Sequence, residues 1–140
     1  MTRGMLAKVL HNLSNTPAAS AEADFTDVNG EYFADAVAWA AEAGIISGYG
    51  DGLFGPNDSI TREQLAVMLH RFAGKPAANG PALAQKDTKQ ISEYALPAMR
   101  WAVEYGIISG KADNMLDPKG QATRAEVASM LMRFCQNQNL

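Results

Sequence analysis

Three arginines, Arg3, Arg62 and Arg124, each follow a threonine at the start of a segment with helical periodicity. The threonine is a good helix N-cap, because its hydroxyl accepts a hydrogen bond from a free backbone N–H of the first turn. The arginine then falls at the first helical position, beside the positive end of the helix dipole, where a cation does not stabilise the helix. A bound anion would explain this placement. The pattern therefore predicts an anion site that recurs three times along the chain.

The segments behind these arginines have the apolar pattern of amphipathic helices. In the second copy Leu65, Met68, Leu69 and Phe72 recur at positions i, i+3, i+4 and i+7, which form one face of a helix. Gln64 lies three residues after Thr61 and completes a capping box, whereas the first copy has Met5 at this position and lacks one. The first copy also lacks a glycine-rich loop upstream, so Arg62 and Arg124 are the stronger candidates for ligand binding.

An internal repeat organises the chain. An ungapped alignment of residues 39–72 with residues 101–134 has 17 identical residues at 34 positions, which include Gly-Ile-Ile-Ser-Gly at 44–48 and 106–110. Each complete copy reads as a helix, a glycine-rich loop and a Thr-Arg helix, and a lone Thr-Arg helix at 2–13 precedes them. The first helix of the complete copies is predicted from Tyr32 to Ala43 and from about Leu96. In the loop, Leu53 and Phe54 are predicted to be buried.

Size and composition narrow the function classes. A chain of 140 residues is long enough for one compact domain with a core. Its net charge of −3 argues against a general binder of nucleic acid or membrane surfaces. No apolar run is long enough to span a bilayer, and the single Cys135 excludes an internal disulfide. Because the chain starts directly on a helix cap, we expect it to be a piece of a longer protein.

The repeated pattern resembles the S-layer homology (SLH) domain. The resemblance is carried by Phe-Thr-Asp-Val at 25–28, Trp-Ala at 39–40, the Gly-Ile-Ile-Ser-Gly loops, and Thr-Arg-Glu-Gln or Thr-Arg-Ala-Glu at 61–64 and 123–126. It implies an all-α fold, a pseudo-threefold helical bundle with projecting loops. Residues 1–140 would then be a single SLH domain. Its parts are the C-terminal helix of a first repeat at 1–14, a second repeat at 25–74 and a third at 85–136, with connectors at 15–24 and 75–84.

The resemblance also implies a function. SLH repeats hold exported bacterial proteins on a secondary cell-wall polysaccharide that often carries a negatively charged pyruvate ketal, and the arginine of the Thr-Arg motif contacts the glycan between repeats. A carboxylate suits an arginine through charge-assisted hydrogen bonds. We expect an extracellular, cell-surface location, possible self-association, and no cofactor, metal, catalytic residue, nucleic-acid partner or membrane insertion. The predicted glycan-binding residues are Arg3, Arg62, Arg124, Gly48, Tyr49, Gly50, Gly110, Lys111, Trp39, Trp101, Asp27 and Asp87.

Several of these residues have an alternative, structural interpretation. Trp39 and Trp101 offer a flat face for a sugar, but core packing is the favoured role for both. His11 and His70 occupy equivalent helix positions where the third copy has Met132, which favours packing over metal binding or catalysis. The Asp51-Gly52 loop lacks the spaced acids and terminal glutamate of an EF-hand. Each arginine has a salt bridge as its alternative, to Asp27, Asp51, Asp87 or Asp113.

Two other function classes remain as alternatives. A protein-interaction or self-assembly module of a surface protein would oligomerise without the wall and would not depend on the arginines. A glycan hydrolase would need two carboxylates that flank a cleft, and the sequence shows no clear pair.

Overall fold

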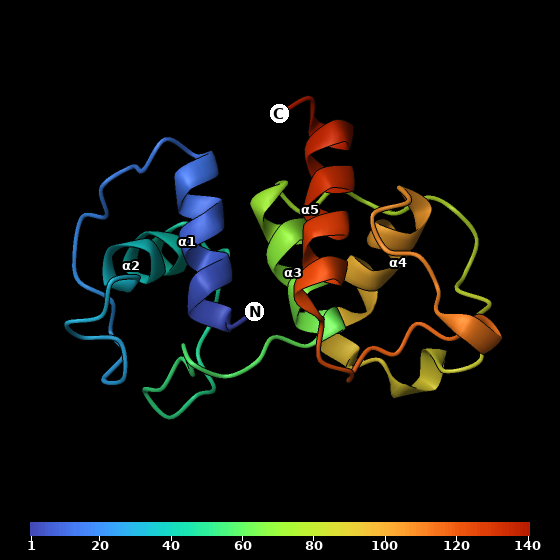
Figure 1. Ribbon diagram of the computed structural model, residues 1–140, viewed down its shortest axis with the longest axis horizontal. Coiled ribbons are helices and arrows are strands. Elements are labelled where there is room, and N and C mark those ends of the chain that lie inside the picture. Colours follow the sequence, from blue (N-terminus) through green and yellow to red (C-terminus); the bar gives the residue numbers. More distant parts are fainter. The chain divides into compact units, whose positions relative to one another are not determined.

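A computed structural model of residues 1–140 contains five α-helices and no strands beyond isolated bridges (Figure 1). The predicted all-α fold is therefore confirmed. None of the helices combines the length and the apolar character that crossing a bilayer requires. The helices are α1 (Arg3–Leu13), α2 (Ala34–Glu42), α3 (Arg62–Phe72), α4 (Leu96–Glu104) and α5 (Arg124–Gln138), with short 3-10 turns η1 (Thr88–Gln90), η2 (Glu93–Ala95) and η3 (Ala112–Asn114).

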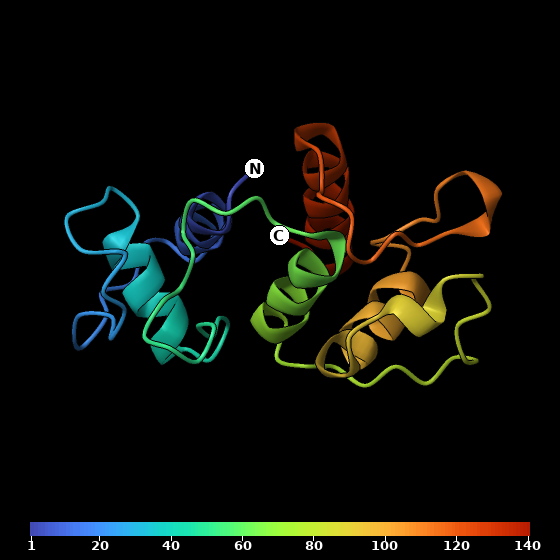
Figure 2. The same cartoon turned by 90° about the horizontal axis from the view of Figure 1, so that it is seen from below.

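The chain forms two compact units, unit 1 (Met1–Ser59) and unit 2 (Ile60–Leu140). In unit 1 the axes of α1 and α2 cross, as Figures 1 and 2 both show. Unit 2 contains α3, α4 and α5. The boundary falls directly before a Thr-Arg helix, because α1 and α3 pack on the helix that follows each of them along the chain. Each compact unit therefore joins the end of one sequence repeat to the beginning of the next, and the predicted division into three repeats stays a prediction.

The Thr-Arg motifs start helices as predicted. The hydroxyls of Thr2, Thr61 and Thr123 each accept a hydrogen bond from the backbone N–H three residues later. Only α3 has the complete capping box, in which the Gln64 side chain also accepts from the Thr61 N–H. At α5 the corresponding carboxylate, that of Glu126, binds another side chain instead.

The first helices of the complete repeats are close to their predicted bounds. Helix α4 begins at Leu96 with a proline in its first turn, as predicted. Helix α2 begins at Ala34, slightly later than the predicted start near Tyr32, because the chain before it forms turns, and it ends at Glu42 with Ala43 as its C-cap. Gly44 follows it at a φ of +71°, a conformation that glycine adopts without strain.

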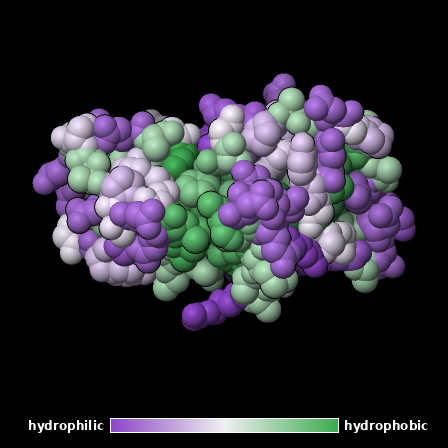
Figure 3. All heavy atoms as spheres, turned by 90° about the horizontal axis from the view of Figure 1, so that it is seen from above, coloured by the Kyte–Doolittle hydropathy of each residue, from purple (hydrophilic) through white to green (hydrophobic).

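Each unit has its own apolar core. In unit 1 Leu6, Leu10 and Phe54 are fully buried, and in unit 2 Leu65, Trp101 and Phe134 are at most 1 % exposed. The surface of unit 1 that is seen at the left of Figure 3 is coloured mainly hydrophilic or intermediate. The prediction that Leu53 is buried beside Phe54 is wrong, since Leu53 is 39 % exposed. Successive side chains of an extended loop point to opposite sides, so only one of the two reaches the core.

A histidine ties each connector to the helix before it. The Nε2 atom of His11 lies 2.9 Å from the Pro17 carbonyl oxygen, and that of His70 lies 2.9 Å from the Pro76 carbonyl oxygen. A carbonyl oxygen only accepts, so Nε2 carries the proton in both rings. Both imidazoles also pack on the tryptophan of the neighbouring helix, with ring centroids 5.2 Å apart. These contacts agree with the predicted packing role of the two histidines.

Candidate functional site

Arg3 and Arg62 each bind the glycine-rich loop that follows them in the sequence. In unit 1 the Nε atom of Arg3 donates to the Phe54 carbonyl at 3.0 Å, and Nη2 donates to the Ser47 carbonyl at 3.2 Å. In unit 2 Arg62 binds the equivalent carbonyls of Leu116 at 2.7 Å and Ser109 at 3.0 Å. The two arginines are 7 % and 4 % exposed. The same atoms thus make the same contacts twice, and each guanidinium holds its loop in place.

The first backbone N–H groups of these helices bind the same loops. In α1 the N–H groups of Arg3 and Gly4 donate to carbonyls of Asp58 and Pro56 at 3.0 and 2.9 Å. In α3 the N–H groups of Arg62 and Glu63 donate to carbonyls of Gly120 and Pro118, at 2.9 and 3.0 Å. Loop carbonyls therefore occupy the positions that the sequence interpretation assigned to an anion at the helix N-terminus.

Arg124 has a different environment from the other two arginines. It is exposed at the start of α5, where no glycine-rich loop of unit 2 covers the helix end. The sequence-based ranking placed Arg124 above Arg3, because Arg3 has no loop upstream. That ranking stays a prediction, although each buried arginine binds the loop downstream of it and not an upstream one.

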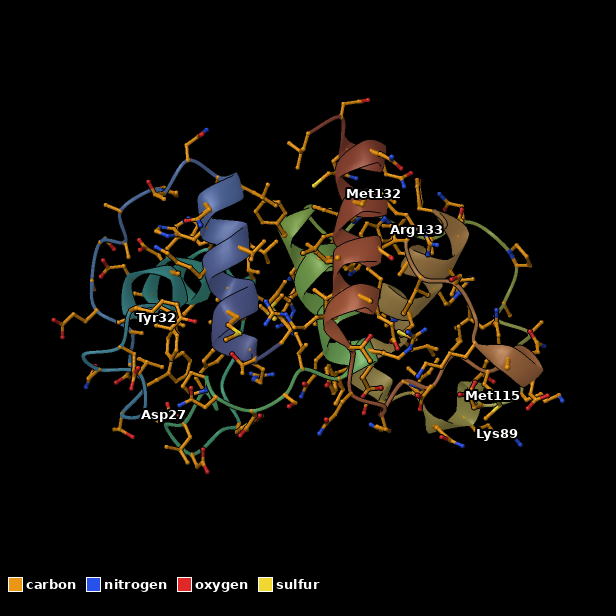
Figure 4. All side chains as sticks on the ribbon, viewed as in Figure 1. Asp27, Tyr32, Lys89, Met115, Met132 and Arg133 are labelled. Carbon is orange, nitrogen blue, oxygen red and sulfur yellow. The ribbon has the colours of Figure 1, made fainter.

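A carboxylate supports each loop from below. The Asp27 oxygens accept from the N–H groups of Phe54 and Gly55 at 3.0 and 2.8 Å (Asp27 is labelled in Figure 4). The Asp87 oxygens accept from the N–H groups of Leu116 and Asp117 at 2.8 and 2.7 Å, and Asp87 is 3 % exposed. Both acids are therefore committed to loop backbone, which makes them positioning residues for the site.

The pKa of Asp27 leads to a prediction for the stability of unit 1 at acid pH. Burial raises this pKa. The N–H groups of Phe54 and Gly55 and the charge of Arg3 together lower it by more than burial raises it, so the pKa lies below its ordinary value of 3.8. A lowered folded-state pKa stabilises the fold above pH 3.8, and this contribution is lost as the pH falls through the folded-state pKa. We expect thermal unfolding scans between about pH 5 and pH 2.5 to show this loss in the parent chain and a weaker pH dependence in Asp27→Asn. Equal slopes in both proteins would contradict this role.

A small hollow of about 230 Å³ lies beside Arg62 in unit 2. The Arg62 Nη1 atom donates to the Glu126 carboxylate at 2.5 Å, and Lys111 Nζ lies 3.7 Å from the other oxygen of that carboxylate. Arg133, labelled on α5 in Figure 4, donates to the Ser109 hydroxyl at 3.2 Å. We call this the Arg62 groove, and it is lined by Arg62, Ile108, Ser109, Ala125, Glu126, Ser129, Met130 and Arg133.

Electrostatics in the Arg62 groove favour an anion. Arg62, Lys111 and Arg133 carry three positive charges in or beside it, against the two carboxylates of Glu126 and Asp117. Lys111 also lies 2.7 Å from Asp117 at the outer side, and this hydrogen bond lowers the pKa of that carboxyl more than burial raises it. The sequence interpretation missed Arg133. Its signal was present, because Arg71 occupies the equivalent position in the other complete repeat.

The surroundings of Arg3 in unit 1 differ chemically from those of Arg62 in unit 2. Tyr49 stands in the place of Lys111, and the Arg3 guanidinium carbon lies 4.8 Å from its ring centroid and 4.6 Å from that of Phe54. The Tyr49 hydroxyl donates to Asp58 at 2.7 Å, and burial together with this bond raises the pKa of Tyr49. Arg3 is thus held between two aromatic rings.

The remaining predicted site residues differ in how exposed they are. Trp101 is 1 % exposed and packs against Phe134, so no face of its ring is open to a sugar. Trp39 is half-buried beside His11. A Cβ on Gly48 would lie 2.5 Å from the Phe25 ring, which explains the glycine by close packing. Gly50 and Gly110 are exposed loop residues. No three His, Cys, Asp or Glu side chains converge as metal ligands would.

Comparison with known proteins identifies the class of this repeat-built helical chain. The sequence model of the S-layer homology domain matches residues 24–66 and 86–128. The chain belongs to this family.

Individual relatives show the same relationship. The chain is 35 % identical over 144 residues to the exoglucanase XynX of Acetivibrio thermocellus, covering 99 % of the chain and 13 % of that enzyme. It is 31 % identical over 134 residues to the S-layer protein EA1 of Bacillus anthracis, covering 94 % of the chain and 15 % of the relative. A cellulosome-anchoring protein of A. thermocellus is 31 % identical over 97 residues, 67 % of the chain and 22 % of the relative.

The chain spans only a small part of the relatives that it matches, at most 22 % of these three. In the enzyme relatives the matching part is a separate SLH domain, and this domain is a non-catalytic anchoring module. The family and the S-layer and cellulosome-anchoring relatives indicate a protein of the cell surface that is associated with the cell wall.

Proposed function

We propose that this chain anchors its parent protein non-covalently to an anionic secondary cell-wall polysaccharide, and that the Arg62 groove is its principal glycan site. The observation that carries the proposal is the surplus of positive charge around a hollow in the loop-to-helix junction of unit 2. A ketal-linked carboxylate would bind in such a hollow through charge-assisted hydrogen bonds, which are stronger than neutral ones.

The three cations of the Arg62 groove have different roles in this proposal. Lys111 is 40 % exposed and Arg133 lines the hollow, so these two contact the ligand carboxylate directly. Arg62 is buried and holds the loop carbonyls, so it shapes the groove and adds charge from behind. Glu126 already lies against Arg62 and Lys111, so the ligand displaces or shares this carboxylate.

The other two arginines are secondary sites. Arg3 occupies the position in unit 1 that Arg62 occupies in unit 2. There Tyr49 offers a ring and a hydroxyl to a sugar in place of the Lys111 charge. Arg124 is exposed at a helix start and is available to an anion without rearrangement. Of the tryptophans, only Trp39 retains exposed surface for a minor contact.

A charge substitution tests the proposal without disturbing the core. Lys111→Gln is expected to weaken binding to isolated sacculi that carry the polymer by about tenfold, because one charged hydrogen bond contributes about 1.5 kcal/mol. Lys89→Gln is the matched control, since Lys89 is an exposed lysine on η1, outside the groove. Co-sedimentation at several salt concentrations measures both variants. Equal affinities of Lys111→Gln and Lys89→Gln would overturn the assignment of the groove.

A further inference from the structure

Unit 1 contains a hollow that no arginine lines. It has a volume of about 720 Å³ and lies between α1, α2 and the connector that joins them. This volume falls within the range of about 300–1,000 Å³ that is typical of small-molecule sites. We call it the connector hollow, and its polar lining includes Lys8, His11, Glu22, Asn29 and Asp35.

Hydrogen bonds fix the connector beside this hollow at two residues, Pro17 and Ser20. The Pro17 carbonyl accepts from His11 Nε2 at 2.9 Å. Three residues further on, Ser20 donates its backbone N–H and its hydroxyl to the two Glu42 carboxylate oxygens at 2.7 and 2.5 Å. These bonds tie the connector to α1 and to the end of α2, so the hollow between them is part of the fold.

A buried histidine borders this hollow. His11 is 5 % exposed, and its Nδ1 atom is buried without a hydrogen bond. Its Nε2 atom lies 2.9 Å from the Pro17 carbonyl oxygen, so the imidazole is fixed at the edge of the hollow.

Unit 2 shows what closes this space. Its equivalent hollow, beside His70, measures only about 250 Å³. Arg100 stands there in the place of Ala38, and its guanidinium donates to the Gly80 carbonyl of the connector at 3.1 Å. Val67 likewise replaces Lys8. The same framework is thus filled by a side chain in unit 2 and left open and polar in unit 1.

We propose that the connector hollow binds one neutral pyranose unit, a hexose or N-acetylhexosamine residue. Small apolar side chains such as Ala34 and Ala38 suit the C–H face of a sugar ring, and the polar rim suits its hydroxyls. The single cation Lys8 faces two carboxylates, those of Glu22 and Asp35, so the lining does not favour an anion. This inference does not rest on the proposed role of the Arg62 groove, which favours an anionic ligand and not a neutral one.

Amide chemical shifts of the full-length chain test the inference. In a titration with N-acetylglucosamine we expect saturable shifts at Lys8, His11 and Asn29, with a dissociation constant on the order of 1 mM for a ligand of this size. Sodium pyruvate, as the anionic probe, should leave these amides unshifted. The absence of saturable shifts up to about 50 mM sugar, or shifts confined to Ser109 and Lys111, would overturn the proposal.

The repeat supplies the variants for this test. Ala38→Arg copies the residue that fills the hollow of unit 2 and should weaken sugar binding at least about tenfold. Ala43→Arg is the matched control, because Ala43 is exposed at the end of the same helix. If Ala38→Arg does not fold, Lys8→Val copies Val67 and should weaken binding about threefold. Unchanged affinity in the folded variant would contradict the assignment of the hollow.

Discussion

Replacing Arg62 by alanine is expected to release the chain from isolated wall polymer and to lower the free energy of unfolding of unit 2 by about 3 kcal/mol. The side chain is 4 % exposed and donates to the carbonyls of Leu116 and Ser109 and to the Glu126 carboxylate. Its removal leaves these acceptors without their donor and frees the loop that carries Lys111. Urea denaturation measures the stability, and co-sedimentation with sacculi measures the binding.

Two further substitutions separate the structural role of Arg62 from its charge. Arg62→Lys keeps the positive charge, but an ammonium group cannot reach both loop carbonyls in the planar geometry of a guanidinium. We expect it to lose most of the stability that alanine loses. Arg124→Ala removes the arginine of the same motif from an exposed position and should leave stability within about 0.5 kcal/mol. Full stability and full wall binding of Arg62→Ala would contradict the role of the buried arginine.

Asp87→Asn should destabilise unit 2 by about 2–3 kcal/mol, although the substitution preserves size and shape. The two carboxylate oxygens of Asp87 accept from the N–H groups of Leu116 and Asp117, at 2.8 and 2.7 Å. An asparagine offers one oxygen, and its NH₂ group would face a second donor without an acceptor. The buried position, 3 % exposed, gives water no access to repair this mismatch.

The control for Asp87 lies in the loop that it supports. Asp113 is exposed, with a φ of +63°, a conformation that asparagine also adopts readily. Asp113→Asn should therefore leave the midpoint of urea denaturation unchanged. We also expect Asp87→Asn to weaken wall binding, because the mobile loop would no longer hold Lys111 beside Glu126. A midpoint for Asp87→Asn equal to that of Asp113→Asn would show that the carboxylate does not support the loop.

Local signals in the sequence were sufficient for the helices and their starts. The Thr-Arg pattern with apolar residues at helical spacing correctly placed α1, α3 and α5, and Gln64 correctly predicted the only capping box. The repeat gave the equivalence of the two glycine-rich loops. It also gave the equivalence of the two histidines, whose packing role the structure supports.

The local sequence patterns did not predict which residues each arginine binds. Arg3 and Arg62 bind carbonyls of residues that are 44 to 54 positions away in the sequence. The loop that each arginine binds belongs to the following repeat. Periodicity describes one element at a time, so it does not reveal this pairing. It also did not distinguish an arginine committed to backbone carbonyls from the exposed Arg124. The connector hollow was missed because it depends on the difference between Ala38 and Arg100 within otherwise equivalent packing.

A calorimetric titration tests the central claim most directly. The full chain is titrated with a disaccharide of the wall polymer that carries a pyruvate ketal, and in parallel with the same disaccharide without the ketal. The proposal predicts saturable binding of the ketal form that weakens as salt is added, about tenfold weaker binding of the ketal-free form, and a similar loss for the ketal form in Lys111→Gln. Equal affinities for the two disaccharides, or no binding of the ketal form, would contradict the proposal that this chain anchors through an anionic glycan.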